Sequence, residues 1–294
     1  MVRFLTLIYN DEKAAIFPFE FIQRFKDLEE LSLKGYFVEE ICQHQETNAL
    51  QEPDGPLLHV RALQLMSLRN LRHLFENAEN VKPGKAFQNI EALSVYRCRR
   101  LNKLVPFLEA FRNMKDLRVS SCNVMTNLLS SSTAKSLVQL TRMSIDDCKQ
   151  IREIAACKEG ETEDEFAFAR LRIVVLHNLP SLGSFYSGNA AMRLPLLEKL
   201  ILSQCSEMRS FSRGIITTQK LNEIFVGIVN ADMFKSVGKR WMDRIEYDCV
   251  PRKQIWEGDI NSTVQKIWED YSNSRGDSSI EKNIQKSREE AVNP

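Results

Sequence analysis

The sequence predicts a right-handed α/β solenoid of about nine repeats, because one spacing of apolar residues returns along most of the chain. The spacing is clearest in residues 90–104 and is repeated in residues 114–128. In both segments the apolar residues or Cys occupy the same relative positions, namely Ile90, Leu93, Val95, Cys98, Leu101 and Leu104, then Met114, Leu117, Val119, Cys122, Met125 and Leu128.

A change of period inside each repeat gives this pattern its structural meaning. The central pair, such as Leu93 and Val95, alternates as a β-strand does, with one face inward and the other outward. The later steps of three suit an irregular or short helical return. One such unit cannot bury its own apolar edge, so it is stable only when stacked on copies of itself. The pattern is typical of a leucine-rich repeat with parallel strands on its concave side, and further copies begin at Val2, Leu28, Val60, Leu140, Leu171, Leu197 and Leu221.

Composition narrows the class of protein. Hydrophobic residues make up 43% of the chain and charged residues 27%, which is typical of a folded protein. The 40 basic and 39 acidic residues leave a net charge of +1, so neither nucleic acid nor an anionic membrane is indicated as a partner. No apolar run approaches the roughly 20 residues that span a bilayer. Seven scattered cysteines favour a reducing compartment, and we expect a cytoplasmic or nuclear protein.

The domain organisation follows from where the repeat pattern stops. We expect residues 1–230 to form the solenoid, residues 231–271 a C-terminal capping segment, and residues 272–294 a disordered tail rich in Ser and charge. Within the capping segment, Ser262 and Gln265 match a capping box. Apolar residues follow it at helical spacing and predict a short amphipathic helix, with Val264, Ile267, Trp268 and Tyr271 on one face.

The N-terminal repeat begins at Val2, which leaves no room for a terminal cap. Two interpretations are open. The chain is a piece of a longer array, or it exposes an apolar edge that another molecule must cover. In either case we expect the isolated chain to expose an apolar N-terminal edge and to self-associate or express poorly, and a clean monomer would count against the first interpretation.

A catalytic function is not indicated. The four histidines fall in different repeats, and no paired Cys-x-x-Cys is present. The phosphate-binding pattern is absent, because Gly84-Lys85 is followed by Ala86 and lacks the upstream Gly. We therefore expect no enzyme activity, cofactor or metal site. The cysteines at the equivalent position of four repeats are expected to be small buried thiols, and they are Cys98, Cys122, Cys148 and Cys205.

One column of residues is a candidate binding surface. The residue between the two strand leucines points away from the core, onto the concave face. This column is mostly polar in the first six repeats and apolar in the last three, where Val175, Ile201 and Phe225 stand. Ile173 adds to this apolar strip, which is a candidate partner-binding site because exposed apolar patches often mark interfaces. The alternative is that the C-terminal helix or tail covers it.

Several phrases of the sequence resemble a known family. The cysteines at the turn position, the linking segment 168–188, and the closing segments 197–211 and 256–265 are similar to the C-terminal repeat region of plant disease resistance proteins. These are the coiled-coil-type nucleotide-binding, leucine-rich-repeat immune receptors. The resemblance implies a protein-interaction module that senses a pathogen effector or a guarded host protein. It also implies that the repeats restrain a nucleotide-binding switch, which is absent from this chain.

A second hypothesis is a leucine-rich-repeat substrate adaptor of a ubiquitin ligase. An F-box-like helical segment ahead of the repeats would favour it, and the sequence shows none.

Overall fold

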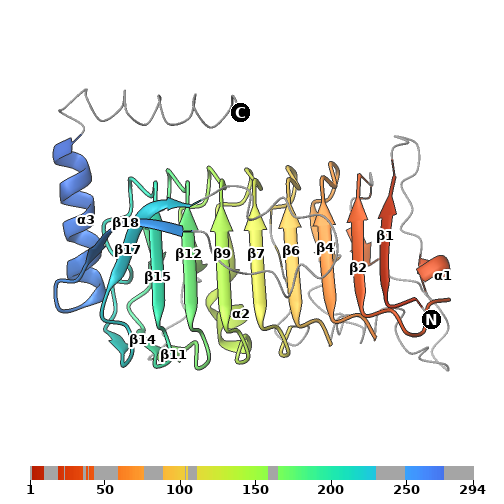
Figure 1. Ribbon diagram of the computed structural model, residues 1–294, viewed down its shortest axis with the longest axis horizontal. Helices are drawn as coiled ribbons and strands as arrows, with labels where there is room; N and C mark the ends of the chain where they lie inside the picture. Colours follow the sequence, from red (N-terminus) through yellow and green to blue (C-terminus); the bar gives the residue numbers. More distant parts are fainter. Residues whose placement is uncertain are drawn as a thin grey trace.

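The main element of the molecule is a ten-stranded sheet that runs along the whole array (Figure 1). The computed structural model describes residues 2–9, 19–22, 24–35, 38, 40–42, 59–75, 89–102, 104, 111–157, 165–229 and 249–274. Each predicted repeat start is followed by one parallel strand of this sheet. The strands are β1 (Phe4–Ile8), β2 (Glu30–Lys34), β4 (Ala62–Met66), β6 (Ala92–Tyr96), β7 (Asp116–Ser120), β9 (Arg142–Asp146), β12 (Ile173–His177), β15 (Lys199–Ser203) and β17 (Ile224–Val229), and β18 (Cys249–Ile255) pairs antiparallel with β17.

The convex side of the described chain consists of short strands and short helices. One three-stranded parallel sheet contains β8 (Asn127–Ser130), β10 (Glu153–Ala156) and β13 (Ser184–Tyr186), and β3 (Glu40–Cys42) pairs with β5 (His73–Phe75). A further sheet joins β11 (Glu165–Ala167), β14 (Ala191–Leu194) and β16 (Ile216–Thr218). Helices α1 (Phe19–Ile22) and α2 (Ser131–Ser136) span only one or two turns. The predicted leucine-rich-repeat solenoid is confirmed, and each of the nine predicted repeats supplies one parallel strand of the main sheet.

The template residues form the core between the two sides. Leu93 and Val95 are buried, as are Leu101 and Leu104 in the return of the same repeat. Corresponding residues stand directly opposite one another in neighbouring strands, for example Leu93 against Leu63 and Leu117. The core is therefore a set of columns that run along the array, and each repeat depends on its neighbours for burial.

A left-handed turn follows most strands of the main sheet. Ser67, Arg97, Ser121, Asp147, Asn178 and Gln204 all have φ near +50°, and Gly35 occupies the same position with φ +79°. A Cβ at Gly35 would lie 2.2 Å from the Tyr9 carbonyl oxygen, so only glycine fits there. The turn aims each N–H at the next repeat, as where Ser121 donates to the Asp146 carbonyl at 3.0 Å. These bonds compensate for a conformation that costs non-glycine residues about 1 kcal/mol or more.

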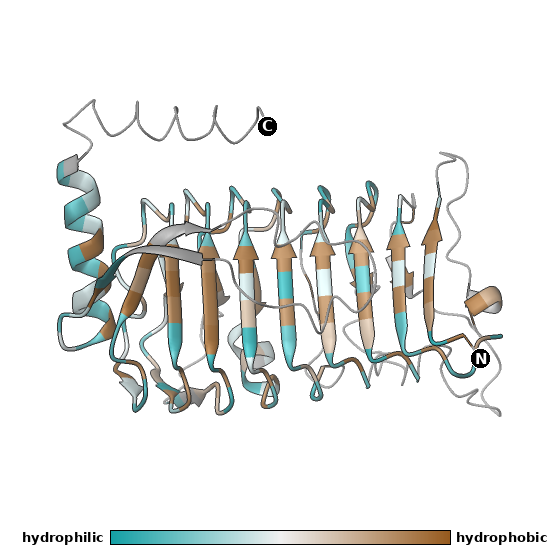
Figure 2. Ribbon diagram, viewed as in Figure 1, coloured by the Kyte–Doolittle hydropathy of each residue, from teal (hydrophilic) through white to brown (hydrophobic). Residues whose placement is uncertain are grey.

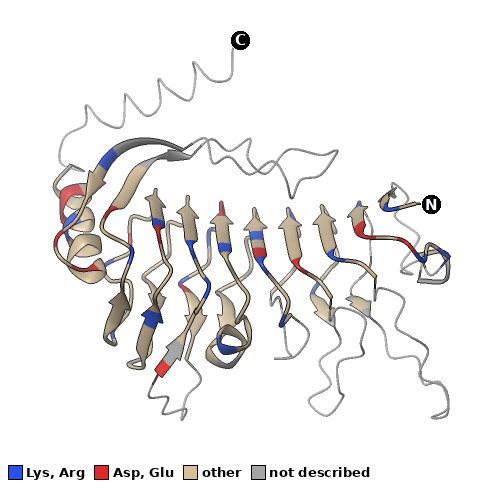
Figure 3. Ribbon diagram, turned by 60° about the horizontal axis from the view of Figure 1, so that its bottom comes forward, with Lys and Arg blue, Asp and Glu red and all other residues tan. Residues whose placement is uncertain are grey.

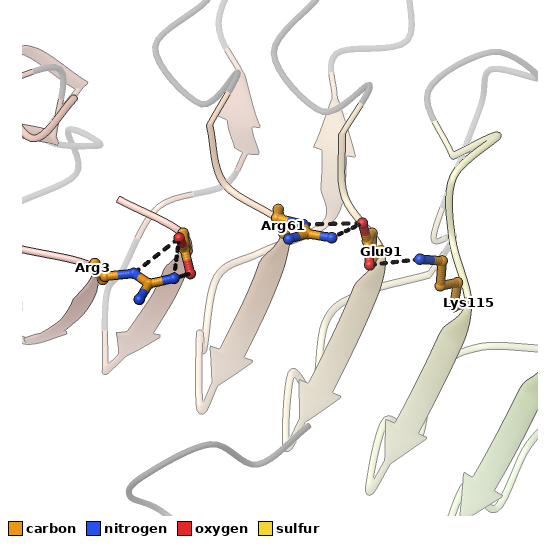
Figure 4. A network of polar contacts seen from close by, with 5 residues as sticks. Arg3, Arg61, Glu91 and Lys115 are labelled. Carbon is orange, nitrogen blue, oxygen red and sulfur yellow. Dashed lines mark hydrogen bonds and ion pairs between the residues drawn. The ribbon is translucent and has the colours of Figure 1, made fainter. Parts of the chain in front are cut away.

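A ladder of alternating charge runs along the residues that precede the first five parallel strands of the main sheet (Figures 3 and 4). Arg3 Nε lies 2.9 Å from Glu29 Oε1. Glu91 accepts from Arg61 Nε at 3.0 Å on one side and from Lys115 Nζ at 2.9 Å on the other. Burial alone would raise the pKa of Glu91, but hydrogen bonds from both cations outweigh it and its pKa is lowered. Stacking places the same position of each repeat side by side, so like charges at this position would repel one another. Because the sign of the charge alternates from repeat to repeat, neighbouring side chains form ion pairs instead.

The helix α3 (Ile260–Ser274) closes the C-terminal end of the array (Figure 1). The predicted capping box is wrong in its first residue. Asp259 is the residue whose carboxylate accepts from the Ser262 N–H at 2.9 Å, so the helix begins one turn earlier than Ser262 would place it. On the predicted apolar face, Val264 is buried and Ile267 packs against the core, whereas Tyr271 is 42% exposed.

Asn261 joins this helix to the last repeat. Its Oδ1 accepts from the Phe211 and Ser212 N–H groups at 2.8 and 3.1 Å, and its Nδ2 donates to the Ser212 carbonyl at 2.9 Å. The side-chain amide thus bonds to the backbone as a strand of a further repeat would. Nearby, the Arg209 guanidinium lies 5.0 Å from the centre of the Trp268 ring.

Candidate interaction surface

The outward residues of the main sheet form one continuous column on the concave face. Strand register places the predicted residues directly opposite one another from strand to strand, which confirms the column as it was read from the sequence. In order they are Thr6, Ser32, Gln64, Ser94, Arg118, Ser144, Val175, Ile201 and Phe225. A ligand on this face can therefore contact several repeats at once.

Side chains in the polar part of this face bond across strands. The Ser32 hydroxyl donates to Gln64 Oε1 at 3.0 Å, which links β2 to β4. Further along, Asp116 receives Arg118 Nε at 3.0 Å from its own strand and lies 3.5 Å from Arg142 Nη1 of β9. Arg118 and Asp116 are both almost buried, so this pair fixes the floor of the face. Lys34 is exposed, and Tyr96 is half-buried with the Arg97 guanidinium 5.0 Å from the centre of its ring. Both side chains keep some surface that a ligand could contact.

A buried polar cluster lies on the concave face, at the last position of three neighbouring strands. Ser120, Asp146 and His177 end three neighbouring strands, and all three are at least nine-tenths buried. The Ser120 hydroxyl donates to Asp146 Oδ2 at 2.9 Å, and His177 Nε2 lies 3.8 Å from Asp146 Oδ1. Burial raises the pKa of Asp146 to about 6. The hydrogen bond from Ser120 opposes this shift, and the charge of Asp147 adds to it.

This cluster does not have the geometry of nucleophilic catalysis. In that chemistry a hydroxyl donates to a histidine, which a carboxylate orients from its other side. Here Asp146 stands between Ser120 and His177, so the hydroxyl donates to the carboxylate. Within the described ranges, no group of three or more His, Cys, Asp or Glu side chains is arranged to hold a metal ion.

The four cysteines at the equivalent repeat position, which the sequence predicts to be small buried thiols, lie in the turn after their strands. Cys98, Cys122 and Cys148 are buried and Cys205 is partly buried. Each thiol donates to the carbonyl two residues earlier, as Cys148 does to Asp146 at 3.3 Å. Burial raises the pKa of Cys98 and of Cys205 to about 12, so these thiols remain protonated at neutral pH.

The structure brings together the four residues of the predicted apolar strip. Val175 and Ile201 form a small cluster, against which Ile173 and Phe225 pack. Figure 2 shows β12, β15 and β17 hydrophobic through their middle, whereas the middle of β6, β7 and β9 is neutral or hydrophilic. Val175 is 0% and Ile201 1% exposed, whereas Ile173 and Phe225 are partly buried. Lys199 Nζ lies 5.2 Å from the centre of the Phe225 ring and covers one side of it.

The strip is buried although it points away from the core, so part of the chain must lie over it. The β17–β18 pair has a register shift between Val226 and Gly227, and such bulges bend a strand pair. Figure 1 shows the pair curving in front of β15, on the concave side. Among the described side chains, Ile173 and Phe225 pack against Val175 and Ile201 and cover part of them. Helix α3 lies elsewhere, because its Trp268 and Tyr271 line a small cleft with Leu202 and Val226, whose side chains point inward.

Sequence reasoning missed three features of this surface. It did not find β18, because the strand lies beyond the last template residue. It also missed the charge ladder and the cluster of Ser120, Asp146 and His177, although each lies at one template position in successive repeats. That shared position is a signal that the sequence contains. The predicted tail at residues 272–294 falls largely outside the described residues, as does the part of the capping segment before Cys249.

Comparison with known proteins agrees with this geometry. A family model described as plant disease resistance protein RPS2-like, leucine-rich repeats, matches residues 1–111 and 107–226. Among solved structures, the leucine-rich repeat domain of the type III effector XCV3220 (XopL) is similar at 16% identity and a TM-score of 0.35, over 74% of this chain and 76% of that one. No curated protein matches. None of the described helices has the length and apolar character needed to cross a membrane. The chain belongs to the RPS2-like leucine-rich repeats of plant disease resistance proteins.

Proposed function

We propose that this chain recognises a protein, either a pathogen effector or a host protein that such an effector alters, through its concave face. The observation that carries the proposal is the unbroken column of outward residues across nine parallel strands. A surface of this kind presents a graded series of side chains to an extended ligand, and solenoid proteins use such faces for binding. Membership in the resistance family supports a protein as the ligand.

The polar part of the face supplies the contacts that distinguish one partner from another. Lys34 and Tyr96 stand on the same outward row of β2 and β6, and Arg142 of β9 stands on the opposite row of the face. A cation and an aromatic ring with free surface are typical of residues that dominate binding energy at interfaces. The fixed ion pair of Asp116 and Arg118 beneath them keeps the floor rigid, so little ordering is required on binding.

The apolar strip contributes to this site in two ways. We propose that Val175 and Ile201 hold the β17–β18 pair in place and so fix the C-terminal wall of the face, since Phe225 of β17 packs against them. Ile173 and Phe225 keep part of their surface open at its edge. We propose that a partner contacts Ile173 and Phe225 and packs against the wall. Val175 and Ile201 do not contact the partner and only hold the wall in place.

We propose in addition that, in the complete receptor, the repeats restrain a nucleotide-binding domain that lies outside this chain. The support is the resemblance of the sequence to nucleotide-binding, leucine-rich-repeat immune receptors, together with the match to the resistance-protein repeats. The partners of this chain would then be an intramolecular domain before recognition and a foreign or guarded protein after it.

Binding measurements with paired variants test the recognition proposal. The concave variant combines Lys34→Glu with Tyr96→Ala, and the matched control combines Lys135→Glu with Val138→Ala on the convex side. Both sets reverse one exposed charge and truncate one side chain that has solvent-accessible surface. Co-precipitation with candidate effectors and with the receptor's nucleotide-binding domain should fall at least about tenfold for the concave variant alone, equivalent to about 1.4 kcal/mol. Equal loss in both variants, or none in either, contradicts recognition by this face. Thermal melts confirm that both variants are folded.

A further inference from the structure

The ladder of alternating charge is interrupted at Thr141. From Arg3 to Lys115 the residue before each strand alternates in charge, and the next position of that alternation would be an acid. Thr141 stands there instead, before β9, and the cation Arg172 follows it before β12. The Thr141 N–H donates to the Lys115 carbonyl at 2.9 Å, and the Arg172 N–H donates to the Thr141 carbonyl at 2.9 Å, so the three residues are direct neighbours. Because parallel strands lie about 4.8 Å apart, the Cα atoms of the two cations are about 10 Å from each other.

The preceding step of the ladder shows what a carboxylate does at such a position (Figure 4). Glu91 lies between Arg61 and Lys115 and accepts from Arg61 Nε at 3.0 Å and from Lys115 Nζ at 2.9 Å. Arg61 and Lys115 are two strands apart, as are Lys115 and Arg172. A carboxylate placed above Thr141 would therefore have a cation on either side in the same way.

The two cations beside Thr141 keep donors for a further acid. Among the described residues each has one carboxylate partner, and that partner lies on the side away from Thr141. Lys115 Nζ lies 2.9 Å from Glu91, and Arg172 Nη1 lies 3.2 Å from Glu198. Both cationic side chains are about half exposed, and an ammonium has three N–H donors and a guanidinium five. The Thr141 hydroxyl donates to the Lys115 carbonyl at 2.8 Å and supplies no negative charge to either cation.

The surroundings of this gap are basic as well. We compare the residue before the strand and the first residue of the strand in two groups of four strands. In β7, β9, β12 and β15 there are four cations and two carboxylates at these positions, namely Lys115, Asp116, Arg142, Arg172, Glu198 and Lys199. In β1, β2, β4 and β6 there are two cations and three carboxylates, namely Arg3, Glu29, Glu30, Arg61 and Glu91. An excess of positive charge in one part of a balanced row attracts an acidic partner.

We propose that a protein partner places a carboxylate, from an Asp or Glu side chain, over Thr141 and between Lys115 and Arg172. This assignment rests on the proposed recognition function and names the chemistry of its ligand, which is an acidic segment. Each flanking cation then bridges two acids, one from the chain and one from the partner. Hydrogen bonds between such charged groups are shorter and stronger than neutral ones. Ile173 follows Arg172 and is partly exposed, so an apolar residue of the same segment can contact it.

Thr141→Glu tests the gap within the chain itself, because it supplies the missing carboxylate. Thr141→Gln is the matched control, with a side chain of the same size and no charge. The melting temperature of Thr141→Glu should exceed that of Thr141→Gln at about 20 mM salt, and the difference should disappear at about 0.5 M salt, where exposed charges are screened. Equal melting temperatures at low salt would mean that Lys115 and Arg172 do not pair with an acid at this position, and would overturn the proposal.

A fluorescent hexaglutamate peptide tests the same site with an external ligand. Fluorescence anisotropy at low salt should show binding to the 294-residue chain, and Thr141→Glu and Arg172→Gln should each weaken it at least about tenfold. Thr141→Gln should bind as the parent chain does. Arg61→Gln should do so too, because Arg61 belongs to the same ladder and does not border Thr141. No binding to the parent chain, unchanged affinity in Thr141→Glu, or an equal loss in Arg61→Gln and Arg172→Gln would overturn the proposal.

Co-precipitation with protein partners separates this proposal from recognition by the concave face. If Thr141→Glu retains a partner that the variant with Lys34→Glu and Tyr96→Ala loses, recognition by the concave face stands and the acidic ligand is wrong. If hexaglutamate binds at Thr141 while the concave variant retains its partners, the acid site stands and recognition through Lys34 and Tyr96 is wrong.

Discussion

Ile201→Asp distinguishes a buried apolar strip from an open one. Ile201 is 1% exposed, so the substitution removes a fully buried apolar side chain and introduces a carboxylate into the apolar cluster with Val175 and Phe225. Loss of the apolar burial costs about 2–3 kcal/mol. The carboxylate, without a hydrogen-bonding partner, costs a further 2 kcal/mol or so even if it takes up a proton. We expect the free energy of unfolding to fall by about 4–5 kcal/mol. A site open to solvent would lose no more than about 0.5 kcal/mol.

A truncation identifies what covers the strip. Deletion of residues 227–294 removes the bent part of β17 together with β18 and α3, and deletion of 260–294 removes α3 alone. If the strand pair is the cover, Ile201→Asp should cost little in the first truncation and its full amount in the second. Such non-additivity is the measure of a shared contact. Chemical denaturation followed by circular dichroism gives the four free energies that each cycle requires.

Two results would refute this reasoning. A cost below about 0.5 kcal/mol in the full chain means that the strip is open. An equal cost with and without residues 227–294 means that the strand pair does not cover it. Ile173→Asp provides the control, since Ile173 is partly exposed and should lose clearly less stability than Ile201.

Three further predictions concern the rest of the array. Leu93→Ala should cost about 2–5 kcal/mol in denaturant melts, while Ser94→Ala on the outward face should stay within about 0.5 kcal/mol; similar costs would mean that the strand register is wrong. Asn261→Ala should cost about 1–3 kcal/mol because two backbone N–H groups lose their acceptor, and hydrogen exchange at Phe211 and Ser212 should accelerate. Asp146→Asn should raise stability at pH 7 by about 2 kcal/mol and have little effect near pH 4, since the pKa of Asp146 is raised to about 6 in the folded chain and its ionised form is disfavoured there. Melting curves between pH 4 and 7 should show that the stability of the wild type falls with rising pH more steeply than that of the variant. Parallel curves would mean that ionisation of Asp146 does not destabilise the folded chain.

The strand register of the concave sheet follows from the sequence because two periods act together. Alternation within the strand decides that Leu93 and Val95 face inward. The repeat length decides which residue of the next strand stands opposite each of them. A slip by one residue would turn every leucine outward, so the pattern permits a single solution. This is why Val175, Ile201 and Phe225 could be placed side by side from the sequence alone.

Features beyond the last repeat could not be derived in the same way. After Val226 no template residue fixes a register, and an antiparallel return such as β18 depends on a bend at Gly227 that periodicity does not contain. At the helix start, Asp259 and Ser262 are both good N-cap residues. The choice between them is made by tertiary contacts, because Asn261 must reach the backbone of Phe211 and Ser212. Local patterns identify the helix, and the packing of the last repeat fixes where it begins.

The concave face shows how a repeat array separates rigidity from recognition. Residues that bond to their neighbours, such as Asp116 with Arg118 and Ser120 with Asp146, already have their hydrogen bonds satisfied before a partner arrives. A ligand that competed for these groups would have to break one bond for each that it made, with little net gain. Side chains with free surface, such as Lys34 and Tyr96, carry no such cost. Substitutions at these exposed positions should therefore alter the choice of partner at little cost in stability, whereas changes in the bonded rows should alter stability first.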